Sequence, residues 1–418
     1  MGEGGAKRRV RASGDTISKE SNHTMTIPAM RSIEEIQQLE HDYSLPLYAK
    51  REIALVRGEG AYLYDSTGKR YLDAMSNCGV AGLGHADPAF TAALTDQLST
   101  LATCHQSFYN DQRAELLAKI ATIAPEGVQR AFLSNSGAEA IEAALKFARA
   151  TTGRPKIVAA KRGYHGRTMG ALSATADNKY RAPFEPLPIP ATHVSFNDLD
   201  ALEAAVDEDT AAIILEPVQG EAGIYPASPA YLKAAREIAT AKGALLIADE
   251  IQSGFRTGVP FYITNAGVTP DLIATAKAVA NGFPIGLTLA TDAIASAMPG
   301  GAHGTTFGGN PLACRAAIVT LNALESRGLY QQAIATGAQI IARIEELNSP
   351  KVRQVRGSGL MLGLELKERV TPTLRGLQER GVLALTASST SLRFLPPMIW
   401  GQEQVDELIA ALGDVLNA

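Results

Sequence analysis

Cysteine is scarce in this chain of 418 residues, which carries only Cys78, Cys104 and Cys314. An odd number of widely separated cysteines fits neither a disulfide framework nor a zinc site. We therefore expect three free cysteines, each a small buried side chain in a protein of the reducing cytoplasm, and no bound metal.

Neither a charge excess nor a long apolar run is present. The 39 basic and 43 acidic residues nearly cancel, so no overall field would attract nucleic acid or an anionic membrane surface. No apolar run approaches the ~20 residues that span a bilayer, and the basic stretch from Lys7 to Arg11 is not followed by the apolar segment of a signal peptide. We expect no membrane span, no signal peptide and no nucleic-acid partner.

Periodicity is absent at the start of the chain. Residues 1–30 are polar, so we expect a flexible tail, with Met25 or Met30 as further candidates for the true start. Residues 31–85 are expected to form an N-terminal segment that packs with the small domain. This segment includes two strands joined by a turn from Asp65 to Gly68.

Between residues 86 and 312, helical stretches alternate with short, continuously apolar segments. This alternation is typical of a mainly parallel sheet with helices on both faces, so the predicted fold class is α/β. Residues 313–418 are expected to form a smaller α+β domain. The expected strands are residues 131–133, 156–160, 211–215, 244–248 and 272–274 in the large domain, and 360–365, 382–385 and 391–395 in the small one.

Lys277 follows one of these apolar strands. A buried ammonium is costly unless it is paired, and desolvation lowers the pKa of a lysine toward the neutral amine that attacks carbonyl carbons. The alternative is a strand-end lysine whose Nζ reaches water. Another apolar strand ends at Asp249 and Glu250. Because ligands in such folds bind beyond the carboxyl ends of strands, we expect the two strand ends to form one site.

Three further polar segments follow predicted strands. Residues 134–140 form a small, glycine-containing turn that opens a helix and could bind an anion through free N–H groups; an ordinary serine cap is the alternative. In residues 162–168, Tyr164 could lie against a ring and Arg167 could bind a carboxylate, or the loop could simply be solvated. Residues 216–223 place two carboxylates and an amide in one loop, although loops are commonly polar.

These segments stand in the order seen in one enzyme family. The chain, from about Ser32 to its end, resembles the class III, fold type I aminotransferases that depend on pyridoxal 5′-phosphate (PLP). The resemblance implies a large PLP-binding domain with a mainly parallel sheet, a smaller C-terminal domain and an N-terminal lobe. The matching segments are residues 135–140, 164–168, 216–221, 249–254, Lys277 and residues 303–311.

The resemblance implies PLP as the cofactor and assigns its contacts. Lys277 would hold PLP as a Schiff base and carry a proton between the substrate carbon and the cofactor. Asp249 would keep the pyridine nitrogen protonated, which makes the ring an electron sink. The other implied contacts are Gln252 at the phenolic oxygen, Tyr164 on one ring face, Ser136, Gly137 and Ala138 at the phosphate, and Thr306 at the same phosphate from the partner subunit of a homodimer.

The resemblance also assigns residues to the substrates. Arg167 would bind the substrate's α-carboxylate. Glu221 would pair with Arg393 and release it when glutamate binds, so that the guanidinium always has a partner. Cys78 and Tyr109 are implied to contact the amino substrate as well. Cys78 stands where ornithine aminotransferases have a tyrosine, which argues against free ornithine as the substrate.

The implied substrate is an amino acid blocked at its α-nitrogen. Residues 303–313 resemble the acetylornithine branch of the family, which acts on ω-amino groups. Other segments resemble enzymes that act on lysine, or its semialdehyde, linked through the α-amine to the small acidic carrier protein LysW, with glutamate as donor. N-acetylornithine is the alternative, and dual activity is a third reading. Lys179 and Arg181 could form a basic rim for the carrier, or a solvated surface. The segments that favour the carrier-linked substrate are residues 179–187, 355–361 and 364–369.

The chain departs from the family pattern at two places. Gly254 to Gly258 is one residue shorter than the usual loop after the Asp-Glu-x-Gln stretch, which makes the path of this loop uncertain. Asn281 replaces a frequent glycine after the lysine, so the backbone there could be less free.

Two other functions remain open from the sequence. The same cofactor and fold support amino-acid racemases and decarboxylating aminotransferases, and a fold alone does not exclude a binding protein without activity.

Overall fold

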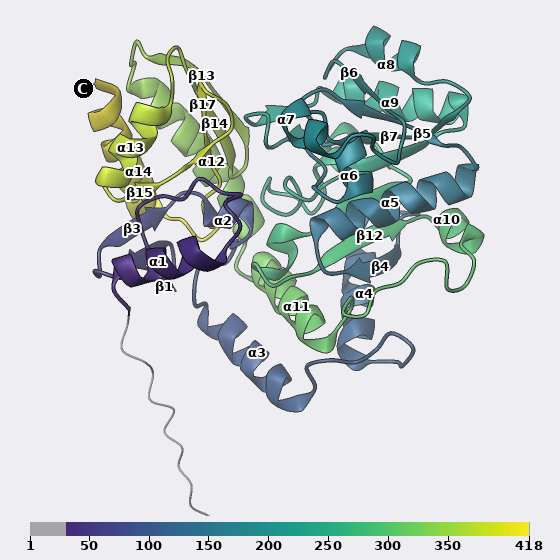
Figure 1. The fold of residues 1–418 in the computed structure, drawn as a ribbon, viewed down its shortest axis with the longest axis horizontal. Helices are drawn as coiled ribbons and strands as arrows, with labels where there is room; N and C mark the ends of the chain where they lie inside the picture. Colours follow the sequence, from purple (N-terminus) through teal and green to yellow (C-terminus); the bar gives the residue numbers. More distant parts are fainter. Residues whose placement is uncertain (1–30, 418) are drawn as a thin grey trace, which may run out of the picture. The chain divides into compact units, whose positions relative to one another are not determined.

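The computed structural model describes residues 31–417, and the predicted flexible tail with its candidate start residues lies outside this range. The chain divides into two compact units at Ala54. In the first unit, α1 (Ile33–Tyr43) begins with a capping box, in which Ser32 Oγ accepts the N–H of Glu35 at 3.2 Å. Helices and strands are labelled in Figure 1.

The second unit contains a seven-stranded sheet with the order β4-β12-β11-β10-β7-β5-β6. The pairs of neighbouring strands from β11 to β6 are parallel, whereas β12 is antiparallel to both of its neighbours. The predicted α/β class with a mainly parallel sheet is therefore confirmed. The strands are β4 (Arg130–Ser134), β5 (Lys156–Ala160), β6 (Ala191–Val194), β7 (Thr210–Leu215), β10 (Leu245–Asp249), β11 (Leu272–Thr275) and β12 (Gly286–Ala290).

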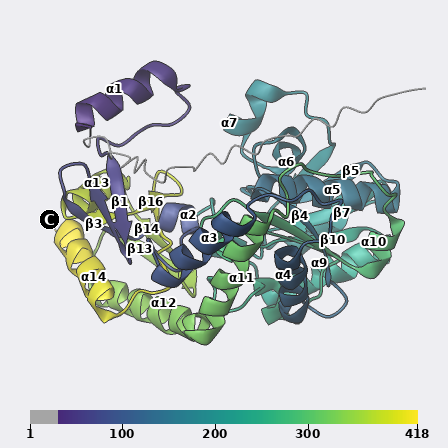
Figure 2. The same ribbon diagram turned by 90° about the horizontal axis from the view of Figure 1, so that it is seen from below.

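Both faces of this sheet are buried, which explains why its central strands are continuously apolar. In β7, Ile213 and Leu215 belong to one buried cluster with residues of α9 (Pro229–Lys242), and Ala212 and Ile214 belong to another with residues of α5 (Gly137–Thr152). Successive side chains of a strand point to opposite faces, so one apolar run supplies both cores. Figure 2 shows β7 and β10 between α5 on one side and α9 on the other.

Helix α9 is capped at both ends by residues that favour helix termini. Ser228 accepts the N–H of Tyr231 at 3.1 Å at the start of α9, and Gly243, with φ of 64°, ends that helix. The helices of the second unit are α2 (Ser76–Gly79), α3 (Pro88–Thr100), α4 (Asp111–Ile123), α5 (Gly137–Thr152), α6 (Met169–Ala174), α7 (Asn178–Arg181), α8 (Leu199–Ala205), α9 (Pro229–Lys242), α10 (Asp292–Ala297), α11 (Pro311–Ser326), α12 (Leu329–Glu346), α13 (Thr371–Glu379) and α14 (Gln402–Asn417), with short 3-10 helices η1 (Ala182–Phe184), η2 (Tyr262–Ala266) and η3 (Lys277–Ala280).

The remaining strands form three small sheets. The predicted turn from Asp65 to Gly68 joins two antiparallel strands as expected, and Gly68 donates its N–H to the carbonyl of Asp65 at 3.0 Å. The three sheets have the orders β1-β2-β3-β15, β13-β14-β17-β16 and β8-β9. Their strands are β1 (Leu55–Glu59), β2 (Tyr62–Asp65), β3 (Arg70–Asp73), β8 (Val218–Gln219), β9 (Tyr225–Pro226), β13 (Val352–Ser358), β14 (Met361–Leu366), β15 (Val382–Leu383), β16 (Leu385–Thr386) and β17 (Ser391–Phe394).

Three expectations about strands and domains need revision or stay untested. The single strand predicted at residues 382–385 is wrong: β15 pairs with β3 and β16 pairs with β17, so the chain leaves one sheet for another at Ala384. The antiparallel strand β12 was not predicted. The domain limits stay predictions, and the limit at residue 312 lies within α11.

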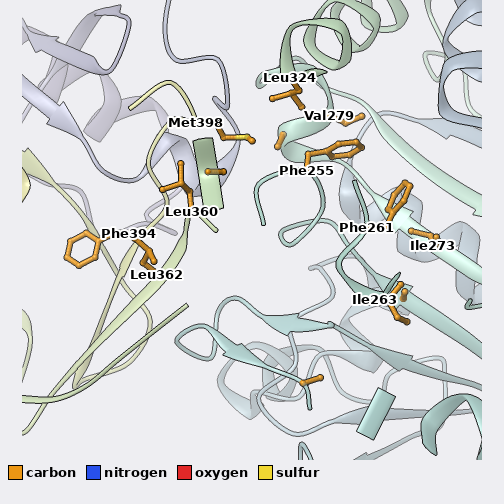
Figure 3. Packing of buried hydrophobic residues seen from close by; sticks show 14 of the residues in the cluster. Phe255, Phe261, Ile263, Ile273, Val279, Leu324, Leu360, Leu362, Phe394 and Met398 are labelled. Carbon is orange, nitrogen blue, oxygen red and sulfur yellow. The ribbon is translucent and has the colours of Figure 1, made fainter. Parts of the chain in front are cut away.

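The largest buried cluster includes residues from both the large and the small sheets. Phe255 and Phe261 lie with their ring centroids 5.7 Å apart. In the same cluster, Leu360, Leu362 and Phe394 come from the region of β14 and β17 (Figure 3). Shared apolar burial of this kind contributes about 25 cal/mol per Å² of area removed from water, so it holds the two parts together.

The cysteine expectation is partly wrong. All three cysteines are free, but Cys78, in α2, and Cys104, in the irregular segment between α3 and α4, are only partly buried. Cys314 lies inside α11, where burial raises the pKa of its thiol to about 12. None of the helices between residues 31 and 417 is long and apolar enough to cross a membrane.

Candidate active site

The polar segments at the strand ends surround one cavity of about 350 Å³. Its walls come from the loops after β4, β5, β7, β10 and β11, as expected for ligand sites in such sheets. The lining includes Val80, Asn135, Ser136, Gly137, Ala138, Tyr164, His165, Gly166, Arg167, Glu216, Glu221, Asp249, Ile251, Gln252, Ala276, Lys277, Phe283 and Ile285.

One end of the cavity is built to hold an anion. Ser136 caps α5, and its Oγ accepts the N–H of Glu139 at 3.2 Å. Among the described residues, the N–H groups of Gly137 and Ala138 have no hydrogen-bond partner, so they are available to a ligand. A side chain at Gly286 would come within 2.2 Å of the Ser136 carbonyl, so this turn requires glycine in the adjacent strand. Free N–H groups and the positive end of the helix dipole favour a phosphate here.

Asp249 lies at the end of β10 and is almost fully buried, with an exposed fraction of 4%. Its Oδ1 accepts the N–H of Ile251 at 3.1 Å, and its Oδ2 lies 2.7 Å from Nδ1 of His165. The carboxylate raises the pKa of His165 even though burial alone would lower it. His165 Nδ1–H therefore holds the carboxylate in place.

Glu216 is a second buried carboxyl beside this pair. Its two oxygens accept the N–H groups of Tyr164 and Gly220, each at 2.9 Å. Burial raises the pKa of Glu216 from 4.5 to about 7, while His165 opposes the shift and Asp249 adds to it. Near neutral pH, the Glu216 carboxyl is therefore protonated in part of the molecules and ionised in the rest.

The variant Glu216→Gln should change the pH dependence of stability. A carboxyl whose pKa is raised on folding binds more protons in the folded state, so its contribution lowers the free energy of unfolding as pH rises from about 4.5 to 7. Glutamine lacks this dependence. We expect the melting temperature of the variant, relative to the parent, to be higher at pH 8 than at pH 5. Calorimetry at both pH values measures this, with exposed Glu203→Gln as the control; equal differences at the two pH values would contradict the assignment.

Lys277 begins η3 directly after β11, in the left-handed backbone region with φ of 47°. A residue with a side chain rarely adopts this conformation, and such strain is common at functional sites. Among residues 31–417, Nζ has no hydrogen-bond or ion-pair partner. Desolvation lowers the pKa of Lys277, although the nearby Glu221 partly offsets it. The amine is thus disposed toward its neutral, nucleophilic form.

Asn281 ends η3 in the same left-handed region, with φ of 47°, so it adopts the conformation that a glycine would. Asparagine tolerates this region better than most residues. Its side chain also accepts the N–H of Leu83 at 2.8 Å and donates to the carbonyl of Gly84 at 3.2 Å. The replacement of glycine therefore adds two contacts that fasten the lysine turn to the loop before α3.

On the other side of the cavity, Glu221 and Arg393 form a two-pronged ion pair with distances of 2.6 and 3.0 Å. Arg393 lies on β17 and is 3% exposed. Burial alone would raise the pKa of Glu221, but the guanidinium more than offsets it, so the pKa is lowered. Arg393 also lies 3.5 Å from Oε1 of Gln252. A side chain at Gly220 would approach that oxygen within 1.9 Å, so Gln252 can enter the cavity only beside a glycine.

Tyr164 and Arg167 lie together at the edge of the cavity. Arg167 Nε donates to the Tyr164 hydroxyl at 3.2 Å, and its guanidinium lies 3.6 Å from the ring centroid of Tyr180. Arg167 is exposed but is supported by these two rings. The structure therefore presents one supported cation on the solvent side of the cavity.

Four predicted site residues do not line this cavity: Thr306, Tyr109, Cys78 and Arg393, although Glu221, the ion-pair partner of Arg393, does line it. Thr306 and Tyr109 are exposed, and Tyr109 is fully so at 107%. Cys78 lies in α2, where Ser76, Asn77 and Cys78 have left-handed φ angles. The cofactor and substrate roles of Thr306, Tyr109 and Cys78 remain predictions.

The short loop after Gln252 takes an inward path. Arg256 is fully buried and donates to the carbonyls of Leu360, Gly79 and Pro396, the last two at 3.4 and 3.3 Å. Burial lowers the pKa of Arg256 to about 10. The loop thereby joins the segment after β10 to α2 and to the residues that flank β14 and β17.

Sequence reasoning assigned no role to His165, Glu216 or Tyr180. His165 and Glu216 lie in segments that were matched to the family. A histidine beside a glycine, shortly after a strand, was the signal that could have identified His165. The contact of His165 with Asp249 joins positions 84 residues apart, so the sequence alone could not reveal it.

The cavity fits the cofactor that the resemblance implies. Free N–H groups suit a phosphate, the buried Asp249 carboxylate suits a protonated ring nitrogen, and the unpartnered Lys277 amine suits an aldehyde carbon. These three features line the same cavity.

Comparisons with known proteins give the same result. Residues 47–416 match the family described as aminotransferase class-III. The LysW-aminoadipate semialdehyde transaminase of Deinococcus radiodurans is 45% identical over 382 residues, which cover 90% of this chain and 89% of that protein. The acetylornithine aminotransferase of Archaeoglobus fulgidus is 42% identical over 371 residues, covering 88% and 97%.

Among solved structures, the ornithine aminotransferase of Toxoplasma gondii, with partial occupancy of PLP at its active site, has a TM-score of 0.89 and 30% identity, and the match covers 93% of this chain and 95% of that chain. The family match covers most of the chain, and both relatives exceed 40% identity. The chain therefore belongs to the class-III aminotransferases, and its cofactor is pyridoxal phosphate.

Proposed function

We propose that this aminotransferase moves an amino group between glutamate and the ω-position of an amino acid blocked at its α-nitrogen, and that carrier-linked lysine, or its semialdehyde, is the principal substrate. The ion pair between Glu221 and Arg393 carries the proposal. The names of the relatives favour the carrier-linked substrate, and N-acetylornithine is the second candidate because one relative is an acetylornithine aminotransferase.

Each residue of the cavity would act on a different part of the cofactor. When bound, PLP supplies a conjugated ring that accepts the electron pair released as a C–H bond beside the substrate nitrogen breaks. Lys277 would hold the cofactor and then move a proton to or from that carbon. Asp249 would retain a proton on the ring nitrogen. The remaining proposed contacts are Gln252 at the phenolic oxygen, Tyr164 at the ring, and Ser136, Gly137 and Ala138 at the phosphate.

Two amino donors of different shape must use one site. Arg167 would bind the α-carboxylate of glutamate, and Arg393 would bind its side-chain carboxylate after leaving Glu221. With the ω-amino substrate, which has no carboxylate at that end, Glu221 would keep Arg393 paired. The guanidinium is 3% exposed, and a buried charge without a partner is strongly destabilising, so this exchange avoids the cost.

We further propose a homodimer in the cytoplasm. The exposure of Thr306 and Tyr109 away from the cavity of their own chain supports a role at the site of a partner subunit. Thr306 would reach the partner's phosphate site, and Tyr109, like Cys78, would contact the amino substrate. The small acidic carrier protein would be the macromolecular partner during turnover.

Turnover of carrier-linked lysine and of N-acetylornithine, each with 2-oxoglutarate as acceptor, tests the proposal. We expect kcat/KM to be at least about tenfold higher for carrier-linked lysine, a difference of about 1.4 kcal/mol in transition-state binding. A preference of the same size for N-acetylornithine would overturn the choice of principal substrate.

Addition of L-glutamate alone separates the proposal from other chemistry on this fold. We expect the cofactor absorbance to change to that of the amine form, with release of one equivalent of 2-oxoglutarate. Racemisation or carbon dioxide release instead would contradict transamination.

A further inference from the structure

A second chamber of about 530 Å³ adjoins the active-site cavity. The two spaces share Tyr164 and Glu221 in their walls. The second chamber is larger than the 350 Å³ cavity at Lys277, so it has room for a substituent that extends beyond the reacting end of a substrate. Its position beside Glu221 places it next to the part of the site that must distinguish glutamate from the amino substrate.

Basic side chains outnumber acidic ones in the walls of this chamber. Lys161, Arg162, Lys179 and Arg181 line it, against the carboxylates of Asp177 and Glu221. His193 also lines it, but burial lowers the pKa of its imidazole, so His193 adds little charge near neutral pH. A concave surface with an excess of one sign concentrates ligands of the opposite charge.

Most of these charges already have partners. Lys179 pairs with Asp177 at 3.0 Å, and Arg181 pairs with Glu185 at 3.2 Å. Glu221 is engaged by Arg393. The two cations that the sequence had suggested as a rim, Lys179 and Arg181, are therefore largely neutralised.

Lys161 and Arg162 differ from the other cations. Within the part of the chain that the structure describes, neither forms an ion pair with a carboxylate. The Arg162 guanidinium lies 4.6 Å from the ring centroid of Tyr225, which restrains it, and its backbone has a left-handed φ of 63°. Backbone strain at a charged residue beside a ligand cavity is a feature of binding sites.

We infer that the second chamber binds the anionic portion of the acyl group on the blocked α-nitrogen of the amino substrate, with Lys161 and Arg162 as its counter-charges. The inference rests on the proposed function, because it assigns a place to the blocking group. The ω-amino end would lie at Lys277 while a carboxylate on the acyl group lies among the unpaired cations. The acidic carrier would satisfy this chemistry, and so would a small acyl group that carries a carboxylate.

A matched pair of substrates isolates this charge. N2-succinyl-lysine and N2-acetyl-lysine have the same reacting amine, but only the succinyl group carries a carboxylate. With 2-oxoglutarate as acceptor, we expect the ratio of kcat/KM for the succinyl over the acetyl compound to be about ten in the parent protein. In the double variant Lys161→Gln, Arg162→Gln the ratio should fall about tenfold, and salt should lower it in the parent protein by screening.

Two control variants remove the same charge elsewhere. Lys233→Gln alters an exposed lysine on α9 and should leave the ratio unchanged. Lys179→Gln removes a cation already paired with Asp177 and should lower the ratio less than the double variant does. If the double variant left the ratio unchanged, either with no loss of activity or with an equal loss for both substrates, the inference would be overturned.

Binding of unreactive analogues keeps the test independent of turnover. N2-succinyl-norleucine and N2-acetyl-norleucine lack the ω-amine, so calorimetry with the PLP-loaded protein reports binding alone. We expect tighter binding of the succinyl analogue in the parent and loss of that preference in the double variant. If neither lysine derivative reacts, the proposed substrate class fails. The norleucine pair still decides the inference, and equal binding of both analogues to the parent would refute it.

Discussion

Replacing Lys277 with alanine is expected to lower turnover with glutamate as amino donor by at least about a thousandfold, since a positioned base contributes 10²–10⁴ in rate and Lys277 is also the proposed attachment point of the cofactor. No other lysine lines the cavity among residues 31–417. The loss should appear in kcat, because the proposed carboxylate contacts of Arg167 and Arg393 would remain. Single-turnover absorbance with L-glutamate measures it.

Loss of activity in this variant should not reflect loss of folding. The Lys277 amine is desolvated and, among residues 31–417, has no hydrogen-bond or ion-pair partner, so its removal breaks no hydrogen bond or ion pair. We expect the melting temperature of the cofactor-free variant to equal or exceed that of the cofactor-free parent. Added methylamine should restore part of the rate, because a small amine can occupy the space of the missing side chain. Unreduced turnover in Lys277→Ala would refute the site assignment.

The sequence pattern predicted the positions of the main site residues correctly, because the end of a strand can be recognised from neighbouring residues in the chain. The apolar run before Asp249 and the one before Lys277 each end where polar residues begin, and parallel strands bring such ends to one edge of the sheet. The turn at Ser136 was recognisable for a similar reason, since a cap, a glycine and an amphipathic helix lie next to one another in the chain. These inferences needed no knowledge of long-range contacts.

The pairing of the strands was harder to predict from the sequence. Gly286–Ala290 is a short, fully buried strand, and an apolar run of this length does not reveal its direction. Residues 382–385 read as one strand, but the chain pairs first with β3 and then with β17. The choice between one strand and two depends on partners more than 300 residues away in the case of β3, so local pattern could not decide it.

The supporting residues of the site were the hardest to predict. His165 gains its role from Asp249, and Arg256 gains its role from carbonyls of Gly79 and Pro396. Tertiary contact creates both roles. In addition, the pKa of Glu216 depends on burial, which no local pattern specifies.

The second large effect is expected at Asp249. The variant Asp249→Asn keeps the shape of the side chain but removes the charge that would retain a proton on the ring nitrogen, so electron withdrawal by the cofactor should weaken. Removal of one preorganised electrostatic contact at a reacting centre typically costs 10² to 10³ in kcat, and we expect a loss of about this size. Stopped-flow rates with L-glutamate measure it, and Asp249→Glu should retain more activity because it keeps the charge. A rate within about threefold of the parent would exclude the proposed role of Asp249.

The contact between His165 and Asp249 makes this prediction sharper. His165 lies 2.7 Å from the carboxylate and is 2% exposed, so we expect it to act mainly through Asp249, as a positioning residue. We expect His165→Asn to lower kcat less than Asp249→Asn does, and to shift the pH at which the cofactor absorbance titrates. Residues that act through one contact are not additive, so His165→Asn should have little further effect in the Asp249→Asn background. Additive losses in the double variant would show that His165 acts on the reaction by a route other than the Asp249 carboxylate.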